Sequence, residues 1–158
     1  MNRAYPERPL VGIGAVIVDA GRVVAVRRGG EPLKGQWSIP GGLIEAGETL
    51  QAAVVREAKE ETGLTVQVGE LLEVFDRITL DAEGRVQYHF VLLDFLCRPV
   101  SGQLRAGGDA AEARWLTADE LTAFPIGLDA AEVLRKGLER AEHDRGDRFL
   151  EEMKNPPG

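Results

Sequence analysis

The residues most capable of chemistry are three glutamates spaced three and four positions apart, Glu57, Glu60 and Glu61. In a helix of 3.6 residues per turn, this spacing places their carboxylates on one face, within about 60° of one another. They would also lie in the last turns of that helix, where the helix dipole disfavours acidic side chains. Carboxylates crowded in this way spread into water, take up a proton or bind a cation, and divalent metals such as Mg²⁺ prefer oxygen ligands.

The residues before these glutamates favour a metal-binding role for the glutamates over the alternative, an acidic helix face that is simply exposed to solvent. The chain reads Gly42, five residues, Glu48, seven residues and then Arg56-Glu57-Ala58-Lys59-Glu60-Glu61-Thr62-Gly63-Leu64. This 23-residue pattern resembles the complete Nudix box, and so many fixed positions match by chance far less often than a short motif does. Ala58 is the position where this sequence fits the box least well, because a bulkier aliphatic residue is often found there.

The resemblance implies the α/β fold class, as an α/β/α sandwich with a mixed β-sheet. It also implies an enzyme that cleaves a nucleoside diphosphate linked to another moiety, with Mg²⁺ as cofactor and Mn²⁺ as a substitute. The chemistry is consistent with this, because pyrophosphate hydrolysis develops negative charge on phosphoryl oxygens and needs an activated water. A metal supplies both, which allows an acidic protein to accept an anionic substrate.

By the same resemblance, the box supplies the metal ligands, which are the carboxylates of Glu57, Glu60 and Glu61 and the carbonyl of Gly42. Glu57 and Glu61 would be the core ligands, and Glu60 would be a further ligand or the general base. Arg56 would orient a glutamate, while Glu48 would pair with Arg56 or join the metal ligands. Which glutamate acts as the base, and how many metal ions bind, stays open at this point.

Five residues outside the box are further candidates. Glu112 resembles the downstream acid that many members use as an extra metal ligand or base; a solvated loop acid is the alternative, and Asp109 is the substitute candidate. Arg27 and Arg28 could hold a substrate phosphate, or merely keep an edge strand soluble. Trp37 could stack on a nucleobase, although a tryptophan this near a strand is more often a core residue.

The segments 37–42 and 112–115 resemble those of family members that act on ADP-ribose. The expected reaction is therefore the hydrolysis of ADP-ribose to AMP and ribose 5-phosphate. The alternative substrate is a nucleoside triphosphate such as 8-oxo-dGTP. An alternative of another class is a non-catalytic nucleotide-binding module with a regulatory role, which would be expected to have lost acids from the box, whereas all of them are present.

The composition restricts the partners. Nineteen Lys and Arg against 26 Asp and Glu give a net charge of −7, which would on average repel a nucleic-acid polymer. No apolar run approaches the roughly 20 residues of a membrane span, and the first residues lack the apolar core of a secretory signal. The single cysteine, Cys97, excludes an internal disulfide. We therefore expect a cytoplasmic protein with a small nucleotide substrate, and a homodimer stays open.

The elements that position these residues follow from the hydrophobic pattern. Alternating residues predict a strand over 11–18 with a hairpin return over 23–26. Apolar residues at helical spacing predict a helix over 49–62, capped by Thr49 and ended by Gly63. The remaining predicted elements are strands over 66–78 and 86–97, the first with a break near Gly69, a short strand over 113–116, a brief helix opened by the capping box Thr117 to Glu120, and an amphipathic helix from Leu128 to about Glu142.

Hairpins outnumber strand-helix-strand units in this order, which predicts a mixed sheet covered by helices. We expect one domain over residues 1–158, with flexible ends at about 1–8 and 150–158.

Overall fold

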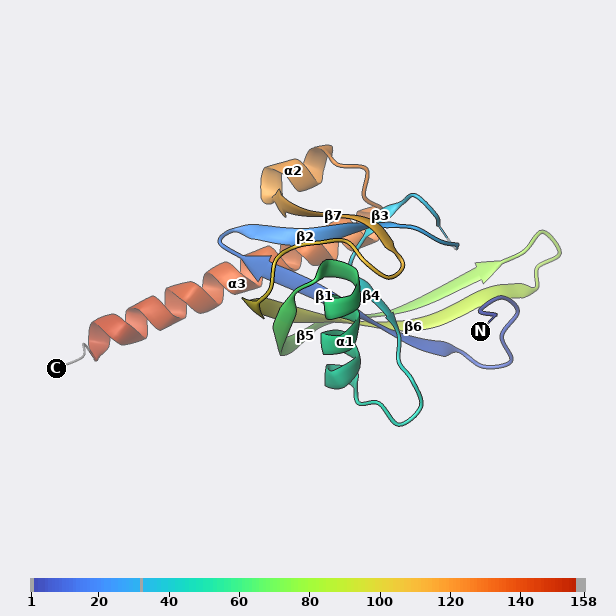
Figure 1. Cartoon of the computed structure of the whole chain (residues 1–158), viewed down its shortest axis with the longest axis horizontal. Helices are drawn as coiled ribbons and strands as arrows, with labels where there is room; N and C mark the ends of the chain where they lie inside the picture. The colour runs from blue at the N-terminus through green and yellow to red at the C-terminus, as the bar shows by residue number, and fades with distance from the viewer. Residues whose placement is uncertain (1, 32, 156–158) are drawn as a thin grey trace.

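The computed structural model describes residues 2–31 and 33–155. Their helices and strands follow in the order β1 (Leu10–Asp19), β2 (Arg22–Arg28), β3 (Trp37–Ser38), β4 (Gly41–Leu43), α1 (Leu50–Thr62), β5 (Thr65–Leu80), β6 (Val86–Ser101), β7 (Ala110–Thr117), α2 (Ala118–Ala123) and α3 (Leu128–Lys154). Within these ranges the strands form one seven-stranded sheet with the order β3-β2-β1-β6-β5, while β4 pairs with β1 and β7 pairs with β2 (Figure 1). Strands β1 and β6 run parallel and the other pairs antiparallel, so the sheet is mixed as predicted.

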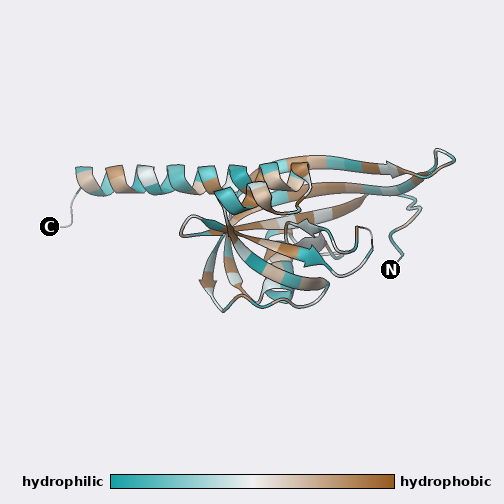
Figure 2. Ribbon diagram, turned by 90° about the horizontal axis from the view of Figure 1, so that it is seen from above, coloured by the Kyte–Doolittle hydropathy of each residue, from teal (hydrophilic) through white to brown (hydrophobic). Residues whose placement is uncertain are grey.

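The central strand β1 is buried on both faces because helices cover both sides of the sheet (Figures 1 and 2). Successive strand residues point to opposite faces. One face packs on α1 through Ile13, Ala15, Ile17, Ala53, Val54 and Ala58. The other face packs on α3 through Val16, Val18, Val133, Leu134 and Leu138. The predicted α/β/α sandwich is therefore confirmed.

Helix α1 begins and ends where the sequence predicts. The Thr49 hydroxyl accepts a hydrogen bond from the Ala52 N–H (3.1 Å), and Gly63 ends the helix in the left-handed conformation (φ 75°). The loop of residues 102–109 then covers this end: the Arg105 N–H donates to the Thr62 carbonyl (2.8 Å) and the Gly107 N–H to the Glu61 carbonyl (3.3 Å). These donors satisfy carbonyls that a helix end leaves unpaired, which lessens the conflict between the helix dipole and the nearby glutamates.

Both predicted hairpins are confirmed, and a register shift between Val68 and Leu71 confirms the break near Gly69. Their strands run further than the pattern indicates, and Figures 1 and 2 show the β5–β6 hairpin extending well beyond the sheet. Strands β3 and β4 were not predicted, because two or three residues beside Pro40 carry no readable periodicity.

The last helix is longer than predicted, since α3 continues past Glu142 to Lys154. Its outer part projects from the body, with Phe149, Leu150 and Met153 exposed (Figures 1 and 2). Of the ends predicted to be flexible, residues 150–154 belong to this helix, whereas residues 1 and 156–158 lie outside the described chain. No helix in the described part of the chain has the length and apolar character needed to cross a membrane.

Candidate active site

Arg56 connects Glu57 of α1 to Glu48 and Leu43 in the segment that precedes the helix. Its Nε and Nη2 donate to both carboxylate oxygens of Glu48 (2.7 and 2.8 Å), and its Nη1 donates to Oε1 of Glu57 (2.7 Å). Nη2 also donates to the Leu43 carbonyl (3.1 Å). The hydrogen bonds from Arg56 lower the pKa of Glu48 to about 2, and those to Glu48 and Glu57 raise the pKa of Arg56. The pairing between Arg56 and Glu48 that the resemblance implies is thus present.

Glu57 lies directly against the backbone of Gly42. A Cβ atom placed on Gly42 would come within 2.5 Å of Oε1 of Glu57, so only glycine leaves room for the carboxylate in this position. Burial raises the pKa of Glu57 more strongly than the hydrogen bond from Arg56 lowers it. The structure therefore places a partly desolvated carboxylate beside the strand β4 backbone.

Glu61 is held by the neighbouring residue of the same strand. The Gly41 N–H donates to Oε1 of Glu61 (2.7 Å), and the residue is 6% exposed. Burial, together with the charges of Glu57 and Asp109, raises the pKa of Glu61 to about 7, although the Gly41 hydrogen bond and Arg28 oppose the shift. A buried carboxylate that is costly to ionise is a natural partner for a cation.

Glu60 differs from the other two acids, because its side chain is 52% exposed. Its carboxylate lies 3.5 Å from Nη1 of Arg56, on the outer side of the cluster. The three acids therefore present one buried, one partly buried and one solvated carboxylate along the same helix face.

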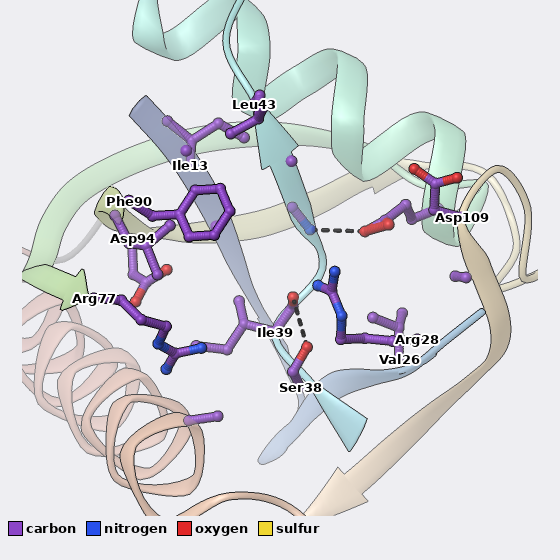
Figure 3. Close-up of a pocket in the computed structure, with 18 of the residues that line it drawn as sticks. Ile13, Val26, Arg28, Ser38, Ile39, Leu43, Arg77, Phe90, Asp94 and Asp109 are labelled. Atoms are coloured by element: carbon purple, nitrogen blue, oxygen red, sulfur yellow. Dashed lines mark hydrogen bonds between the residues drawn. The ribbon is translucent and has the colours of Figure 1, made fainter. Parts of the chain in front are cut away.

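A cavity of about 340 Å³ opens in front of Gly41, Gly42 and Glu61. This volume lies in the range of pockets that enclose small ligands. Figure 3 shows Arg28 and Asp109 on one side of it, and Phe90, Asp94 and Arg77 on the other. Burial and the charges of Arg3 and Arg77 lower the pKa of Arg28, and the charges of Glu61 and Asp109 oppose this shift.

The two downstream acids lie in different places. Asp109 lines the cavity, and its charge raises the pKa of both Glu57 and Glu61. Glu112 lies in β7, where Arg114 donates to it (2.8 Å) and Arg27 is 3.5 Å away on the paired strand. These hydrogen bonds lower the pKa of Glu112, which is not among the residues that line the cavity. The structure brings Asp109, the substitute candidate, to the acid cluster.

Of the other candidates outside the box, one lines the cavity and two do not. Arg28 lines the cavity, whereas Arg27 pairs with Glu112. Strand β2 is not an edge strand, because it pairs with β1, β3 and β7. Trp37 is 6% exposed and packs edge-on against Phe124 (centroids 4.7 Å apart), outside the cavity. Cys97 of β6 is buried.

The donor set suits a divalent cation in its chemistry. Carboxylates of Glu57, Glu60 and Glu61, together with Asp109 and the Gly42 carbonyl, are hard oxygen ligands of the kind that Mg²⁺ and Mn²⁺ take. The missing side chain at Gly42 keeps the Glu57 carboxylate against the strand backbone, which fits a shared ligand position. In the described ranges, however, no three acids, histidines or cysteines already stand close enough to hold an ion together, so binding requires side-chain rotation.

The sequence patterns did not identify the residues that line the cavity on the side opposite the box. Arg77 and Phe75 come from β5, and Phe90 and Asp94 come from β6. One signal was available: Asp94 is the single acid in the apolar stretch 90–97, and an acid in a buried strand is unusual.

Comparisons with known proteins agree with this architecture. The NUDIX domain model matches residues 8–137. The chain is 37% identical over 113 residues to a Methanocaldococcus jannaschii protein named ADP-ribose pyrophosphatase, which covers 72% of this chain and 64% of that protein. It is 36% identical over 115 residues to Putative 8-oxo-dGTP diphosphatase 2 of Mycobacterium tuberculosis, covering 71% of this chain and 75% of that protein.

A solved structure, the MutT NUDIX hydrolase from Burkholderia pseudomallei, superposes with a TM-score of 0.71 at 32% identity, over 82% of this chain and 98% of that one. The family model extends over most of the chain and includes the acid cluster, Arg56 and all of the residues that line the cavity except Arg3. This chain belongs to the Nudix family.

Proposed function

We propose that this chain is a divalent-metal-dependent pyrophosphohydrolase that cleaves a nucleoside diphosphate linked to another moiety, with ADP-ribose as the leading substrate. The observation that carries the proposal is the arrangement at one wall of the cavity. Glu61 and Arg28 line the cavity, the Gly41 N–H donates to Glu61, and Glu57 of the same helix lies against the backbone of Gly42, which also lines the cavity. The products from ADP-ribose would be AMP and ribose 5-phosphate.

The residues of the cluster divide the work. Glu57 and Glu61, with Glu60, Asp109 and the Gly42 carbonyl as further oxygen donors, would hold the cation. A bound Mg²⁺ or Mn²⁺ would neutralise phosphoryl oxygens and lower the pKa of a water molecule. Arg28 would bind a non-bridging phosphate oxygen, and Arg56 would keep Glu57 in place through its hydrogen bond of 2.7 Å.

A glutamate must also accept the proton of the attacking water. Glu60 reaches solvent most easily, and Glu61 has a pKa of about 7, close to the value at which a general base works best near neutral pH. At saturating metal, replacing each by glutamine separates the roles, because only the variant that lacks the base then loses the ascending limb in the pH profile of kcat. The other variant keeps that limb at reduced activity.

The substrate is tested with a panel of nucleotides in the presence of Mg²⁺ or Mn²⁺, with product identity as the readout. Faster formation of AMP and ribose 5-phosphate from ADP-ribose than of monophosphate from any triphosphate supports the leading substrate. The name of the M. tuberculosis relative favours the second candidate, a triphosphate such as 8-oxo-dGTP, which would yield monophosphate and pyrophosphate.

The enzymatic role itself is tested with Glu61→Gln. We expect metal-dependent hydrolysis to fall by orders of magnitude, because the variant loses a charged metal ligand. Glu83→Gln is the matched control, since Glu83 lies on the exposed β5–β6 turn with a side chain that is 70% exposed. If nucleotides bind but none is hydrolysed, the proposed enzymatic function is wrong and the chain is a non-catalytic nucleotide-binding module.

A further inference from the structure

A second carboxylate lies in the cavity on the side away from the α1 glutamates. Asp94 of β6 is 6% exposed and lines the cavity. It lies opposite Gly14 of the parallel strand β1, and a Cβ atom on Gly14 would collide with its Oδ1. The glycine therefore leaves the room that the carboxylate occupies, so this acid is built into the cavity wall.

Asp94 has no polar partner that explains its burial. It makes no hydrogen bond or ion pair with another described residue, and Arg77 acts on it only through longer-range attraction, opposed by Glu73. No sealed-off side-chain oxygen in the described ranges lacks a partner, so the Asp94 oxygens must reach the cavity. Burying a carboxylate without a partner is unfavourable, which makes a ligand group the natural partner.

The surroundings of Asp94 indicate the chemistry of that group. Apolar side chains flank it, and Figure 3 shows Phe90, Ile39 and Arg77 beside it, across the cavity from Arg28 and Asp109. A phosphate oxygen in direct contact with Asp94 would be repelled by its carboxylate, even with Arg77 nearby, whereas a flat ring with N–H groups on its edge can donate to Asp94 and pack against the apolar side chains. Burial raises the pKa of Asp94 to about 6, so at neutral pH it is mainly ionised and only accepts hydrogen bonds.

We propose that Asp94 determines base specificity by accepting a hydrogen bond from the exocyclic amino group of the substrate's nucleobase. The inference rests on the proposed function, because it takes the diphosphate to lie at the α1 side of the cavity. Adenine and guanine both carry such an amino group. Hypoxanthine lacks it and, relative to adenine, presents a carbonyl oxygen in its place, which the carboxylate repels.

The test compares kcat/KM for ADP-ribose and its hypoxanthine analogue in the wild type, Asp94→Asn and Asp76→Asn. The wild type should prefer ADP-ribose by about 10-fold or more, since a charged hydrogen bond is at stake. Asp94→Asn should reduce the ADP-ribose value by about 10- to 100-fold and spare the analogue, because an amide can donate to the hypoxanthine carbonyl. Asp76→Asn makes the same change on an exposed residue outside the cavity and should leave the preference unchanged. An unchanged preference in Asp94→Asn overturns the inference.

Binding measurements keep this outcome separate from a failure of the proposed function. If triphosphates prove to be the substrates, ATP and ITP replace the ADP-ribose pair. If nothing is hydrolysed, calorimetry with AMP, GMP and IMP on the unmodified protein still tests Asp94 without any variant that must fold. Tighter binding of AMP and GMP than of IMP supports the role of Asp94, and equal affinities for all three overturn it.

Discussion

Gly42→Ala should separate catalysis from stability in this protein. Gly42 lies in strand β4, and its backbone is not among the left-handed glycines, so alanine fits the chain conformation. The new Cβ would lie 2.5 Å from Oε1 of Glu57, whereas ordinary contact begins at 3.4 Å. The carboxylate must therefore retreat by 3.4 − 2.5 = 0.9 Å. The end of a flexible side chain can make this move without disturbing the fold.

The two effects of that displacement differ greatly in size. Alanine restricts the unfolded chain and stabilises by about 0.4–1 kcal/mol, while weakening the Arg56–Glu57 hydrogen bond costs about 1.5 kcal/mol, so stability changes by about 1 kcal/mol at most. A displacement of about 1 Å in a catalytic group can lower the rate about 100-fold. We therefore expect a folded enzyme with a strongly reduced kcat.

The measurements are urea unfolding and ADP-ribose hydrolysis as a function of Mg²⁺ concentration. Gly146→Ala is the matched control, because a Cβ atom there meets nothing within 4 Å and the residue lies in the outer part of α3. If Gly42→Ala keeps its kcat within about threefold of the wild type, Glu57 does not depend on this glycine and the geometric reasoning is wrong.

Three further outcomes are expected. Arg56→Lys should destabilise the protein by about 2 kcal/mol in urea unfolding, because one ammonium cannot replace the paired hydrogen bonds to Glu48; a loss below about 0.5 kcal/mol would contradict this. The pKa of Glu61 is raised from 4.5 to about 7, so without metal stability should fall by about 3 kcal/mol between these pH values and level off above them. Calorimetry should show Mn²⁺ affinity rising over the same interval, and a pH-independent affinity would contradict the shift. Asp109→Asn should reduce hydrolysis more than Glu112→Gln, because Glu112 already pairs with arginines outside the cavity, and the reverse order of kcat values would contradict that placement.

The acid cluster was predictable because its determinants are local. A cap at Thr49, a left-handed glycine at Gly63 and apolar residues at helical spacing define α1, and the helix then fixes the relation between its glutamates. The same local pattern predicts that α3 ends near Glu142, where the helical spacing of apolar residues is lost. The helix continues because residues 143–154 contain no proline and many good helix formers, so it needs no packed face to persist.

The far side of the cavity was not predictable because it depends on pairing between distant strands. Gly14 and Asp94 meet only through the parallel register of β1 and β6, which no nearby residue specifies. Glu112 shows the same limit, since its position opposite Arg27 follows from the antiparallel register of β2 and β7. A cross-strand charge pair of this kind forms when the register is set, and sequence spacing does not show it.

The two sides of the cavity come from different parts of the chain. The side with the acid cluster comes from strands β2 and β4, helix α1 and Asp109 of the loop before β7, whereas the opposite side comes largely from the β5–β6 hairpin. Substitutions in that hairpin can therefore change which molecule the cavity accepts while they leave the acid cluster of α1 unchanged. The molecule that the cavity accepts must therefore be inferred from hairpin residues such as Asp94 and Arg77 as well as from the box.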